Sequence, residues 1–160
     1  MDNMLDEELL RLWKCLGQYN VNYIMVGDFA TYFHGFGHPK DALDIWLEDT
    51  LDNRKKLRAA FKALGYGDMK SIETMQFVPG WTSFYVGSVI ELDIMTSMKG
   101  LENMTFTECL EQASIVDIDG ITIPFLHINQ LIQNKKVVNR PKDQIDVMEL
   151  EKIRKIRDGK

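Results

Sequence analysis

The sequence predicts an α/β protein, an α+β arrangement in which helices flank a mixed, twisted sheet and a helical extension forms the C-terminal part. Short apolar runs that are typical of buried strands alternate with longer segments of helical periodicity. Asp119-Gly120 lies between two β-branched runs and indicates a hairpin, and Pro141 begins the second of two charged helical segments near the end. With 160 residues, one core is expected, because single domains have roughly 100–200 residues.

The first half of the chain alternates amphipathic helices with short strands. Apolar residues recur at three- and four-residue spacing from Leu5 to Leu16, which predicts a helix. Tyr23 to Val26 is a compact apolar run that predicts a buried strand. The expected elements are a helix over residues 5–16, a strand over 23–26, a short helix over 29–33, a strand over 43–47 and a charged helix over 52–64. In the charged helix, the apolar period places the basic side chains outward, Arg54 among them.

The second half predicts two pairs of strands and then two helices. Strands are expected over 83–86 and 89–95, joined across Gly87-Ser88, and over 115–118 and 121–125, joined by a type I′ turn. Helices are expected from His127 to about Val138 and from Lys142 to about Arg157. We expect one domain over 1–160, with a core over about 1–100 and the hairpin and C-terminal helices over about 101–160.

Composition and charge exclude several classes of protein. The formal net charge is -5, which argues against a general nucleic-acid binder, since such binding depends on clustered Lys and Arg. No apolar run approaches the roughly 18 residues of a membrane span, and the acidic N-terminus lacks a signal-peptide pattern, so we expect a cytoplasmic protein with no membrane partner. Cys15 and Cys109 match no metal spacing and are expected to be reduced, partly buried thiols.

The turn at Gly27-Asp28 is the first candidate for chemistry. It joins the end of a strand to the start of a helix, and unpaired N–H groups at a helix N-terminus form a ready phosphate site. The alternative interpretation is that Asp28 merely caps the helix that follows.

Carboxylates inside two apolar strands are the second candidate. An acidic residue within such a strand, as at Asp44, is costly unless it is solvated, paired or bound to a cation. Glu91 and Asp93 share one face of a later strand because strand side chains alternate. Mg²⁺ takes one or two protein carboxylates and completes its shell with water and phosphates, so this arrangement suits magnesium.

Four basic residues follow one another closely at Lys135, Lys136, Arg140 and Lys142. Such a run is ordinarily a solvated helix end, and it gains interest only beside other signs of an anionic ligand. Among the remaining residues, His34 is expected in a loop or at the surface, and Trp46 in the core.

Taken together, the Gly27 turn, the Asp44 and Asp93 strands and the C-terminal Arg140-Pro141-Lys142-Asp143 with Asp146 resemble the small bacterial nucleotidyltransferase-fold proteins of the polymerase-beta type. The resemblance covers about residues 9–153. It implies a glycine turn that holds a nucleoside triphosphate, an Asp-x-Asp strand that binds two Mg²⁺ ions and a third carboxylate on a later strand. Gly27 matches the first glycine, Asp44 the second aspartate of the pair, and Asp93 the third carboxylate; Lys135 matches a lysine near the mouth of the site.

The site motif departs from that family at two positions and is partly degenerate. Asp28 stands where a second Gly or Ser is expected, and Ala42 where the first aspartate is expected. A carboxylate about 4 Å from a phosphate charge costs roughly 4 kcal/mol at an effective dielectric of about 20, unless a cation lies between them. Loss of the first aspartate removes a ligand shared by two metals, although one Mg²⁺ on Asp44 and Asp93 remains feasible. Asp41 is a possible substitute if the strand carries a bulge.

Three functional interpretations follow. The first is a Mg²⁺-dependent enzyme that transfers a nucleoside monophosphate to a hydroxyl of a small molecule or a protein, with Asp44 and Asp93 as metal ligands. In it, Gly27, Asp28, Lys135 and Arg140 lie at the nucleotide, and Glu91 activates the acceptor. The second is a catalytically degenerate member that binds a nucleotide or a partner in a toxin-antitoxin-like module. The third is an assembly domain, which would require a large apolar surface patch.

Overall fold

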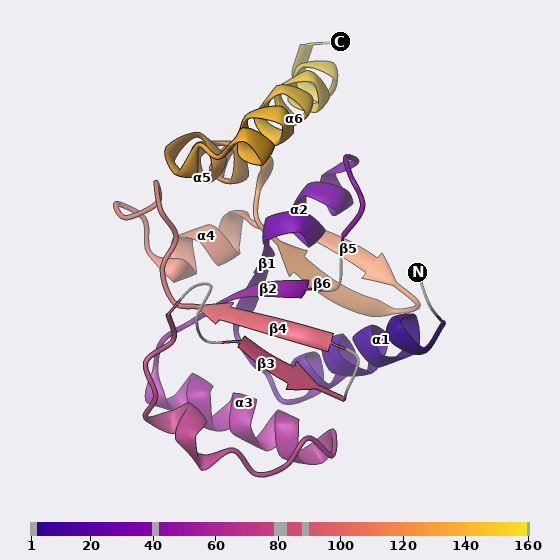
Figure 1. Cartoon of the computed structure of the whole chain (residues 1–160), viewed down its shortest axis with the longest axis vertical. Coiled ribbons are helices and arrows are strands. Elements are labelled where there is room, and N and C mark those ends of the chain that lie inside the picture. The colour runs from indigo at the N-terminus through magenta and orange to yellow at the C-terminus, as the bar shows by residue number, and fades with distance from the viewer. Residues whose placement is uncertain (1–2, 40–41, 79–82, 88–89, 160) are drawn as a thin grey trace.

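A computed structural model describes residues 3–39, 42–78, 83–87 and 90–159 (Figure 1). The helices are α1 (Asn3–Gln18), α2 (Gly27–His34), α3 (Leu51–Ala63), α4 (Phe106–Gln112), α5 (Ile128–Val138) and α6 (Pro141–Gly159), with a short 3-10 helix over Lys70–Glu73. The strands are β1 (Tyr23–Val26), β2 (Ala42–Leu47), β3 (Ser83–Val86), β4 (Ile90–Met95), β5 (Ser114–Ile118) and β6 (Ile121–Phe125). The α/β class is confirmed, and the element bounds differ from the expected ones by at most a few residues.

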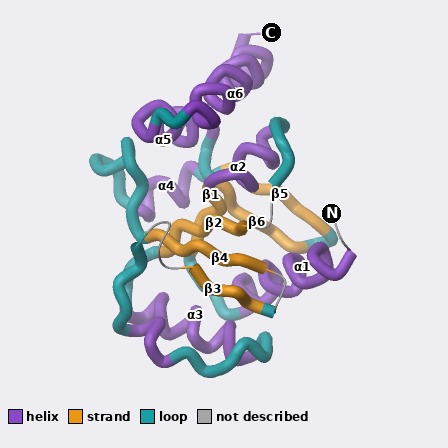
Figure 2. The backbone as a smooth tube through the Cα atoms, viewed as in Figure 1, coloured by secondary structure: helices purple, strands orange, loops and turns teal. Residues whose placement is uncertain are grey.

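The six strands form one mixed sheet in the order β3-β4-β2-β1-β6-β5 (Figure 2). β4 runs parallel to β2 and β6 parallel to β1, while the other neighbouring pairs are antiparallel. At the β5–β6 turn, Asp119 and Gly120 have φ angles of 52° and 80°, which confirms the expected type I′ hairpin. The expected Gly87-Ser88 junction and the start of β4 at Val89 fall partly outside the described residues.

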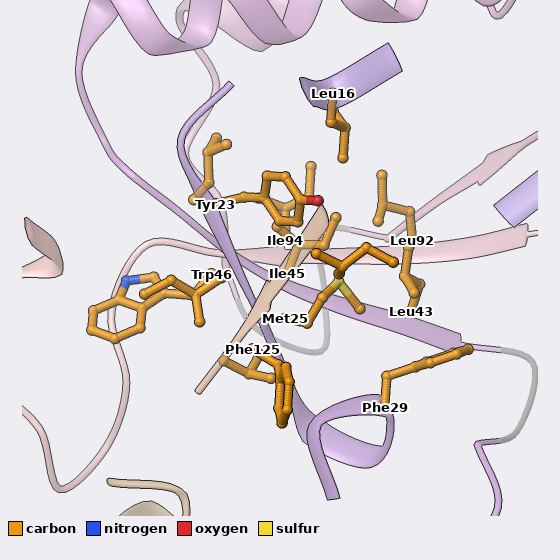
Figure 3. Packing of buried hydrophobic residues seen from close by; sticks show 14 of the residues in the cluster. Leu16, Tyr23, Met25, Phe29, Leu43, Ile45, Trp46, Leu92, Ile94 and Phe125 are labelled. Carbon is orange, nitrogen blue, oxygen red and sulfur yellow. The ribbon is translucent and has the colours of Figure 1, made fainter. Parts of the chain in front are cut away.

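The two faces of the central strands differ in character. Met25, Leu43, Ile45 and Leu92 occupy paired positions on one face, where they are buried against α1 and α3 (Figure 3). Trp13 of α1 donates a hydrogen bond from Nε1 to Met25 Sδ on this face. Because strand side chains alternate, the residues between them point to the opposite face, where Asp44 and Asp93 lie beside the buried side chains of Val26 and Trp46. That opposite face carries the polar side chains considered below.

Two helical segments were not expected, and each has a local cause. Thr105 and Glu108 form a capping box at the start of α4, since the Thr105 Oγ1 accepts from the Glu108 N–H and the Glu108 carboxylate accepts from the Thr105 N–H. The sequence pattern Thr-x-x-Glu carries this signal. The 3-10 helix after α3 has no comparable sequence pattern. It is held in place by Arg54, which donates a hydrogen bond to the carbonyl oxygen of Ile72.

Arg54 corrects the expectation that the basic residues of α3 point outward. Its side chain is only 10% exposed, and it donates to the carbonyl oxygens of Ile72 and Met75 and to the Asp49 carboxylate. Its guanidinium also lies 4.5 Å from the centre of the Phe77 ring. The segment around Ile72 and Met75 folds over the polar side of α3, where Arg54 binds it. The helical period of α3 contains no information about this later segment, so the burial of Arg54 could not be predicted from it.

His34 is likewise buried, at 3% exposure, where a loop or surface position was expected. Its Nε2 lies 2.8 Å from the Leu126 carbonyl oxygen, and Arg157 of α6 donates to its Nδ1. Burial lowers the pKa of His34 to about 4, and the positive charge of Arg157 acts in the same direction. The neutral ring therefore connects α2, the end of β6 and α6.

Trp46 lies in the core, as expected, and both cysteines are buried and free. Within the described residues, none of the helices has the length and apolar character that crossing a bilayer requires.

We predict that His34 makes the fold sensitive to acid. An unfolded chain protonates a histidine near pH 6.5, whereas the folded protein does so only near pH 4. Between these values the unfolded state binds more protons, so the free energy of unfolding decreases as the pH falls through this window and is fully retained above it. In urea denaturation, the loss between pH 7 and pH 4.5 should be about 2 kcal/mol smaller in His34→Gln than in the parent. Equal losses in the two proteins would contradict the assignment.

Candidate functional site

The register of the sheet places the predicted carboxylates side by side. Asp44 of β2 pairs with Val26 of β1 on one side and with Asp93 of β4 on the other. Residues that pair across neighbouring strands share a face, so both carboxylates lie on the face turned away from α1 and α3. Asp44 and Asp93 are only half-buried, in contrast to the apolar residues that flank them in the two strands. The structure therefore brings the Asp44 and Asp93 side chains together at the end of β1.

Gly27 begins α2 immediately after Val26 and has a φ of 65°, in the left-handed region. A Cβ atom on Gly27 would lie 3.0 Å from Asp44 Cγ and closer still to Asp44 Oδ2. Any larger residue would displace the carboxylate, so glycine is required both for the turn and for the position of Asp44. The close approach to Asp44 is therefore a structural reason for glycine at position 27 that does not depend on any ligand.

The carboxylate of Asp44 lies among like charges. The pKa of Asp44 is raised to about 6, chiefly by burial and then by the neighbouring Asp93 and Asp28, while Lys142 and Lys135 act in the opposite direction. Crowded carboxylates of this kind favour a bound cation, because a cation relieves both the repulsion and the cost of burial.

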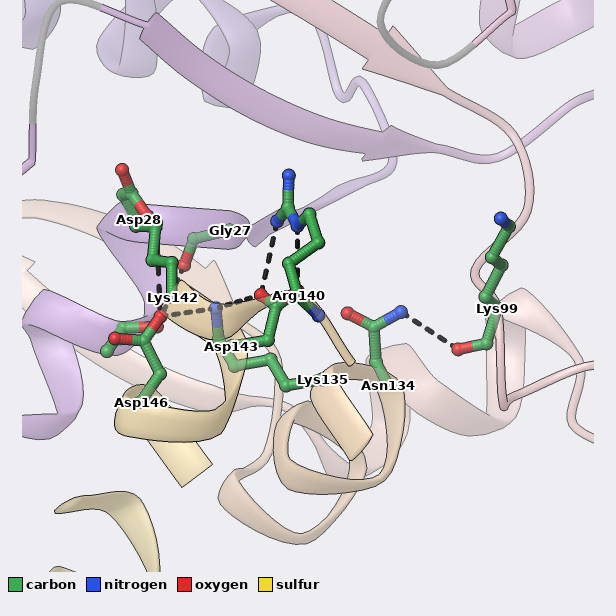
Figure 4. Close-up of polar contacts among 10 residues, drawn as sticks. Gly27, Asp28, Lys99, Asn134, Lys135, Arg140, Lys142, Asp143 and Asp146 are labelled. Carbon is green, nitrogen blue, oxygen red and sulfur yellow. Dashed lines mark hydrogen bonds and ion pairs between the residues drawn. The ribbon is translucent and has the colours of Figure 1, made fainter. Parts of the chain in front are cut away.

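Asp28 occupies the first turn of α2 but does not cap it. Val26 is the N-cap residue of α2, and no side chain accepts a capping hydrogen bond there. The interpretation of Asp28 as an N-cap is therefore wrong. Its carboxylate instead forms an ion pair with Lys142 of α6, as Figure 4 shows. The charge that Asp28 brings to the turn is thus compensated by a lysine from the C-terminal helix.

A cavity of about 350 Å³ opens over the paired carboxylates, which is within the range of ligand pockets. Gly27 forms part of its wall, and its polar lining consists of Asp44, Asp93, Ser97, Lys99, Asn134 and Arg140. Ser97, Lys99 and Asn134 were missed in the sequence, since they come from a loop and a helix with no motif of their own. The lining combines two carboxylates with two cationic side chains.

Arg140 is positioned in this cavity by a bidentate ion pair. Its Nε and Nη2 donate to the two carboxylate oxygens of Asp143 at 2.7 and 3.1 Å, and its backbone N–H donates to Asp143 Oδ2 (Figure 4). Burial alone would raise the pKa of Asp143, but the hydrogen bonds from Arg140 hold it below the usual range. Asp143 is 1% exposed while Arg140 is 65% exposed, so a buried carboxylate orients an accessible guanidinium.

Lys135 lies in the interior between α5 and α6. Its Nζ donates to Asp146 Oδ2 at 2.9 Å and lies 3.7 Å from Asp143 Oδ1, with the side chain 4% exposed. It is not among the residues that line the cavity. Lys135 is the buried member of the basic run, whereas Lys136 is exposed and pairs with Glu151 at the surface.

Glu91 lies two residues before Asp93 in β4, on the same face of the sheet, and pairs with Ala42 of β2. It does not contribute to the cavity lining either. Asp41, the suggested substitute for the missing aspartate, falls outside the described residues.

The residues at the end of β1 fit one magnesium ion bound together with a phosphate ligand. Asp44 and Asp93 supply carboxylate oxygens, which are the donors that Mg²⁺ prefers, and Mg²⁺ ordinarily takes its other ligands from water and phosphates. Within the described ranges, no three His, Cys, Asp or Glu side chains are grouped closely enough to hold a metal by themselves. The donor set thus fits an ion shared between the protein and its ligand, rather than one held in a cage of protein ligands.

Several solved structures have the same arrangement of helices around a mixed sheet. The antibiotic-resistance factor ANT(2″)-Ia superposes with a TM-score of 0.59 at 17% identity, over 98% of this chain and 91% of that one. The lincosamide antibiotic adenylyltransferase LnuA, solved with lincomycin bound, gives 0.59 at 13% identity, over 96% and 98%. A Thermotoga maritima protein assigned as a nucleotidyltransferase gives 0.58 at 16% identity, over 100% and 97%.

The chain therefore has the nucleotidyltransferase fold, which confirms the resemblance seen in the sequence. In sequence, it matches no protein-family model and no curated protein.

We predict that Gly27→Ala destabilises the protein more than an alanine at another left-handed glycine. A positive φ costs an alanine about 1–2 kcal/mol, and at position 27 the new methyl group must also displace Asp44. Gly65→Ala is the matched control, because Gly65 has a φ of 84° and nothing within 4 Å of an added Cβ. Urea denaturation should show a loss of about 2–4 kcal/mol at position 27 and about 1–2 kcal/mol at position 65.

The double variant Gly27→Ala/Asp44→Ala separates the two contributions. Removing the carboxylate should restore the part of the loss that comes from the clash and leave the backbone strain. If Gly27→Ala and Gly65→Ala cost the same, the close approach to Asp44 has no energetic importance.

Proposed function

We propose that the protein is a Mg²⁺-dependent nucleotidyltransferase that transfers a nucleoside monophosphate from a nucleoside triphosphate to a hydroxyl group of a small molecule. The observation that carries this proposal is one cavity that contains the Asp44 and Asp93 pair, the Gly27 turn and two cations, Arg140 and Lys99. A magnesium triphosphate is a ligand that needs carboxylates for its cation and positive charge for its anion in the same place. The fold neighbours named for antibiotics favour a small-molecule acceptor over a protein.

Each group has a role that follows from its chemistry. Asp44 and Asp93 hold Mg²⁺, which supplies charge neutralisation for the phosphates when bound. The first N–H groups of α2 and the guanidinium of Arg140 bind phosphate oxygens, and Lys99 adds a second positive charge at the mouth. Buried Asp143 keeps Arg140 in one orientation, so little side-chain entropy is lost on binding.

In the transfer step, the acceptor oxygen forms a bond to the α-phosphorus while the bond from that phosphorus to the bridging oxygen breaks, and pyrophosphate leaves. The proton of the acceptor hydroxyl requires a base. Glu91 is our choice for this role, because it lies on the same face of the sheet as Asp93, two residues away.

We predict that calorimetry detects triphosphate binding that depends on Mg²⁺, with ATP, GTP, CTP and UTP each tested. Asp93→Asn should weaken it at least about tenfold, because the loss of an interaction with a charged side chain costs about 1.5–3 kcal/mol. Lys99→Ala should weaken it about three- to tenfold, whereas Lys55→Ala, an exposed lysine on α3, should leave it unchanged. An affinity that is the same in magnesium and in EDTA would contradict the proposal.

A second candidate function, a catalytically inactive nucleotide-binding module, is favoured by Asp28 and Ala42. Asp28 brings a negative charge to the turn where the phosphates would lie, and Lys142 compensates it only in part because the pair is accessible to solvent. Ala42 supplies no ligand for a second metal ion.

The two functions are separated by reversing both departures. We predict that Asp28→Asn, which removes the charge at constant size, increases triphosphate affinity about tenfold, since like charges repel by a few kcal/mol at this range. Pyrophosphate release is then measured with a panel of aminoglycosides and lincosamides. Release by the parent protein supports the enzyme, whereas release only by Asp28→Gly/Ala42→Asp identifies the parent as the inactive module.

A further inference from the structure

A second cavity, of about 750 Å³, lies between α1, α2 and the β5–β6 turn. It has no lining residue in common with the cavity over Asp44 and Asp93. In Figure 1, α1 and the β5–β6 hairpin lie close together beside α2. The volume is in the range that encloses organic ligands rather than single ions or waters.

Aromatic side chains form the wall of this second cavity. Trp13 of α1 meets Phe29 and Phe33 of α2 with ring centres 5.7 and 6.0 Å apart, and Tyr32 lies 6.0 Å from Phe33. Trp13 is fixed by its hydrogen bond to Met25 and is 3% exposed. Tyr32 is 44% exposed, which leaves much of its ring accessible. The wall is therefore rigid on one side and accessible on the other, and it offers π-faces to a ligand.

Among the described residues, the formally charged side chains that line the second cavity have one sign. Asp6 of α1 and Asp119 of the β5–β6 turn line it, and no Lys or Arg is among its described lining residues. Across the described ranges, neither carboxylate forms a hydrogen bond or an ion pair through its side chain. The acidic residues of the candidate nucleotide site differ in this respect, since Asp28, Asp143 and Asp146 all pair with lysine or arginine.

We propose that this second cavity binds a small amphipathic organic cation, an ammonium group attached to an aromatic or polycyclic apolar body. The aromatic wall takes the apolar body, and the ammonium group is attracted both by the π-faces and by Asp6 and Asp119. An anion of the same shape is repelled by the two carboxylates, and a neutral molecule gains only the apolar contact.

The second cavity and the nucleotide site lie on different sides of α2. Asp28 and Thr31 face Lys142 and the C-terminal helix, whereas Phe29, Tyr32 and Phe33 face α1. Since no lining residue is shared, both ligands bind at the same time. The proposal does not depend on the nucleotidyltransferase activity.

The experiment uses 1-naphthylmethylammonium and its neutral counterpart 1-naphthylmethanol, each titrated into the full-length protein by calorimetry at pH 7.5. The ammonium compound should bind saturably and about tenfold more tightly than the alcohol, because the accessible rings and the two carboxylates both attract a cation. Ligand-observed saturation-transfer NMR should show contact with the naphthyl protons for both.

The variants separate charge from shape. Asp6→Asn/Asp119→Asn should remove the preference for the ammonium compound without changing affinity for the alcohol, while Tyr32→Leu should weaken both compounds. Glu111→Gln removes an exposed carboxylate on α4, outside the cavity, and should leave both affinities unchanged. Circular dichroism verifies that each variant is folded.

Three results would overturn the proposal: equal affinity for the two compounds, a preference that survives in the double variant, or absence of binding. If binding is absent and sedimentation shows a dimer that Tyr32→Leu dissociates, the cavity is covered by a second copy of the chain instead. A protein that binds no nucleotide but discriminates between the two naphthyl compounds refutes only the proposed transferase function.

Discussion

The candidate site depends on the close approach of Gly27 to Asp44. One residue without a side chain lets the strand-to-helix turn pass over a carboxylate that would otherwise have no space. The same approach brings the first N–H groups of α2 towards the Asp44 and Asp93 pair, so the positive end of a helix faces two negative charges. The turn, the start of α2 and the position of the Asp44 carboxylate are therefore coupled, so a change at Gly27 affects all three.

The C-terminal helices complete this arrangement through buried charge. Lys135, Asp143 and Asp146 form an ionic cluster between α5 and α6, and Arg140 and Lys142 extend from it towards the β1 end. Breaking a buried pair by removing one partner typically costs about 3–5 kcal/mol, so the cluster holds its members in place. Of the basic run, only Lys135 is buried; Lys136, Arg140 and Lys142 are exposed, and among these Arg140 lines the cavity.

The sequence was informative where the signal is local and failed where the partner is distant. The apolar run of β1, the Asp119-Gly120 turn and the alternation that places Glu91 and Asp93 on one face could all be read from neighbouring residues, whereas the pairing of Asp44 with Asp93 depends on the register of the sheet. Burial of Arg54 and His34 could not, because each depends on a segment that folds back from elsewhere. The same holds for Lys99 and Asn134, which join the candidate site only through the packing of α5 against the loop after β4.

The cavity over the paired carboxylates draws its lining from Val26 to Arg140, with contributions from the central strands, the loop after β4 and the α5–α6 junction. Contacts between segments so distant in the chain are slow to form, because long loops must close first. The site is therefore assembled only when most of the chain has already folded, and no fragment of the sheet contains it. A ligand that binds there recognises the completed fold and shifts the folding equilibrium of the whole molecule towards it.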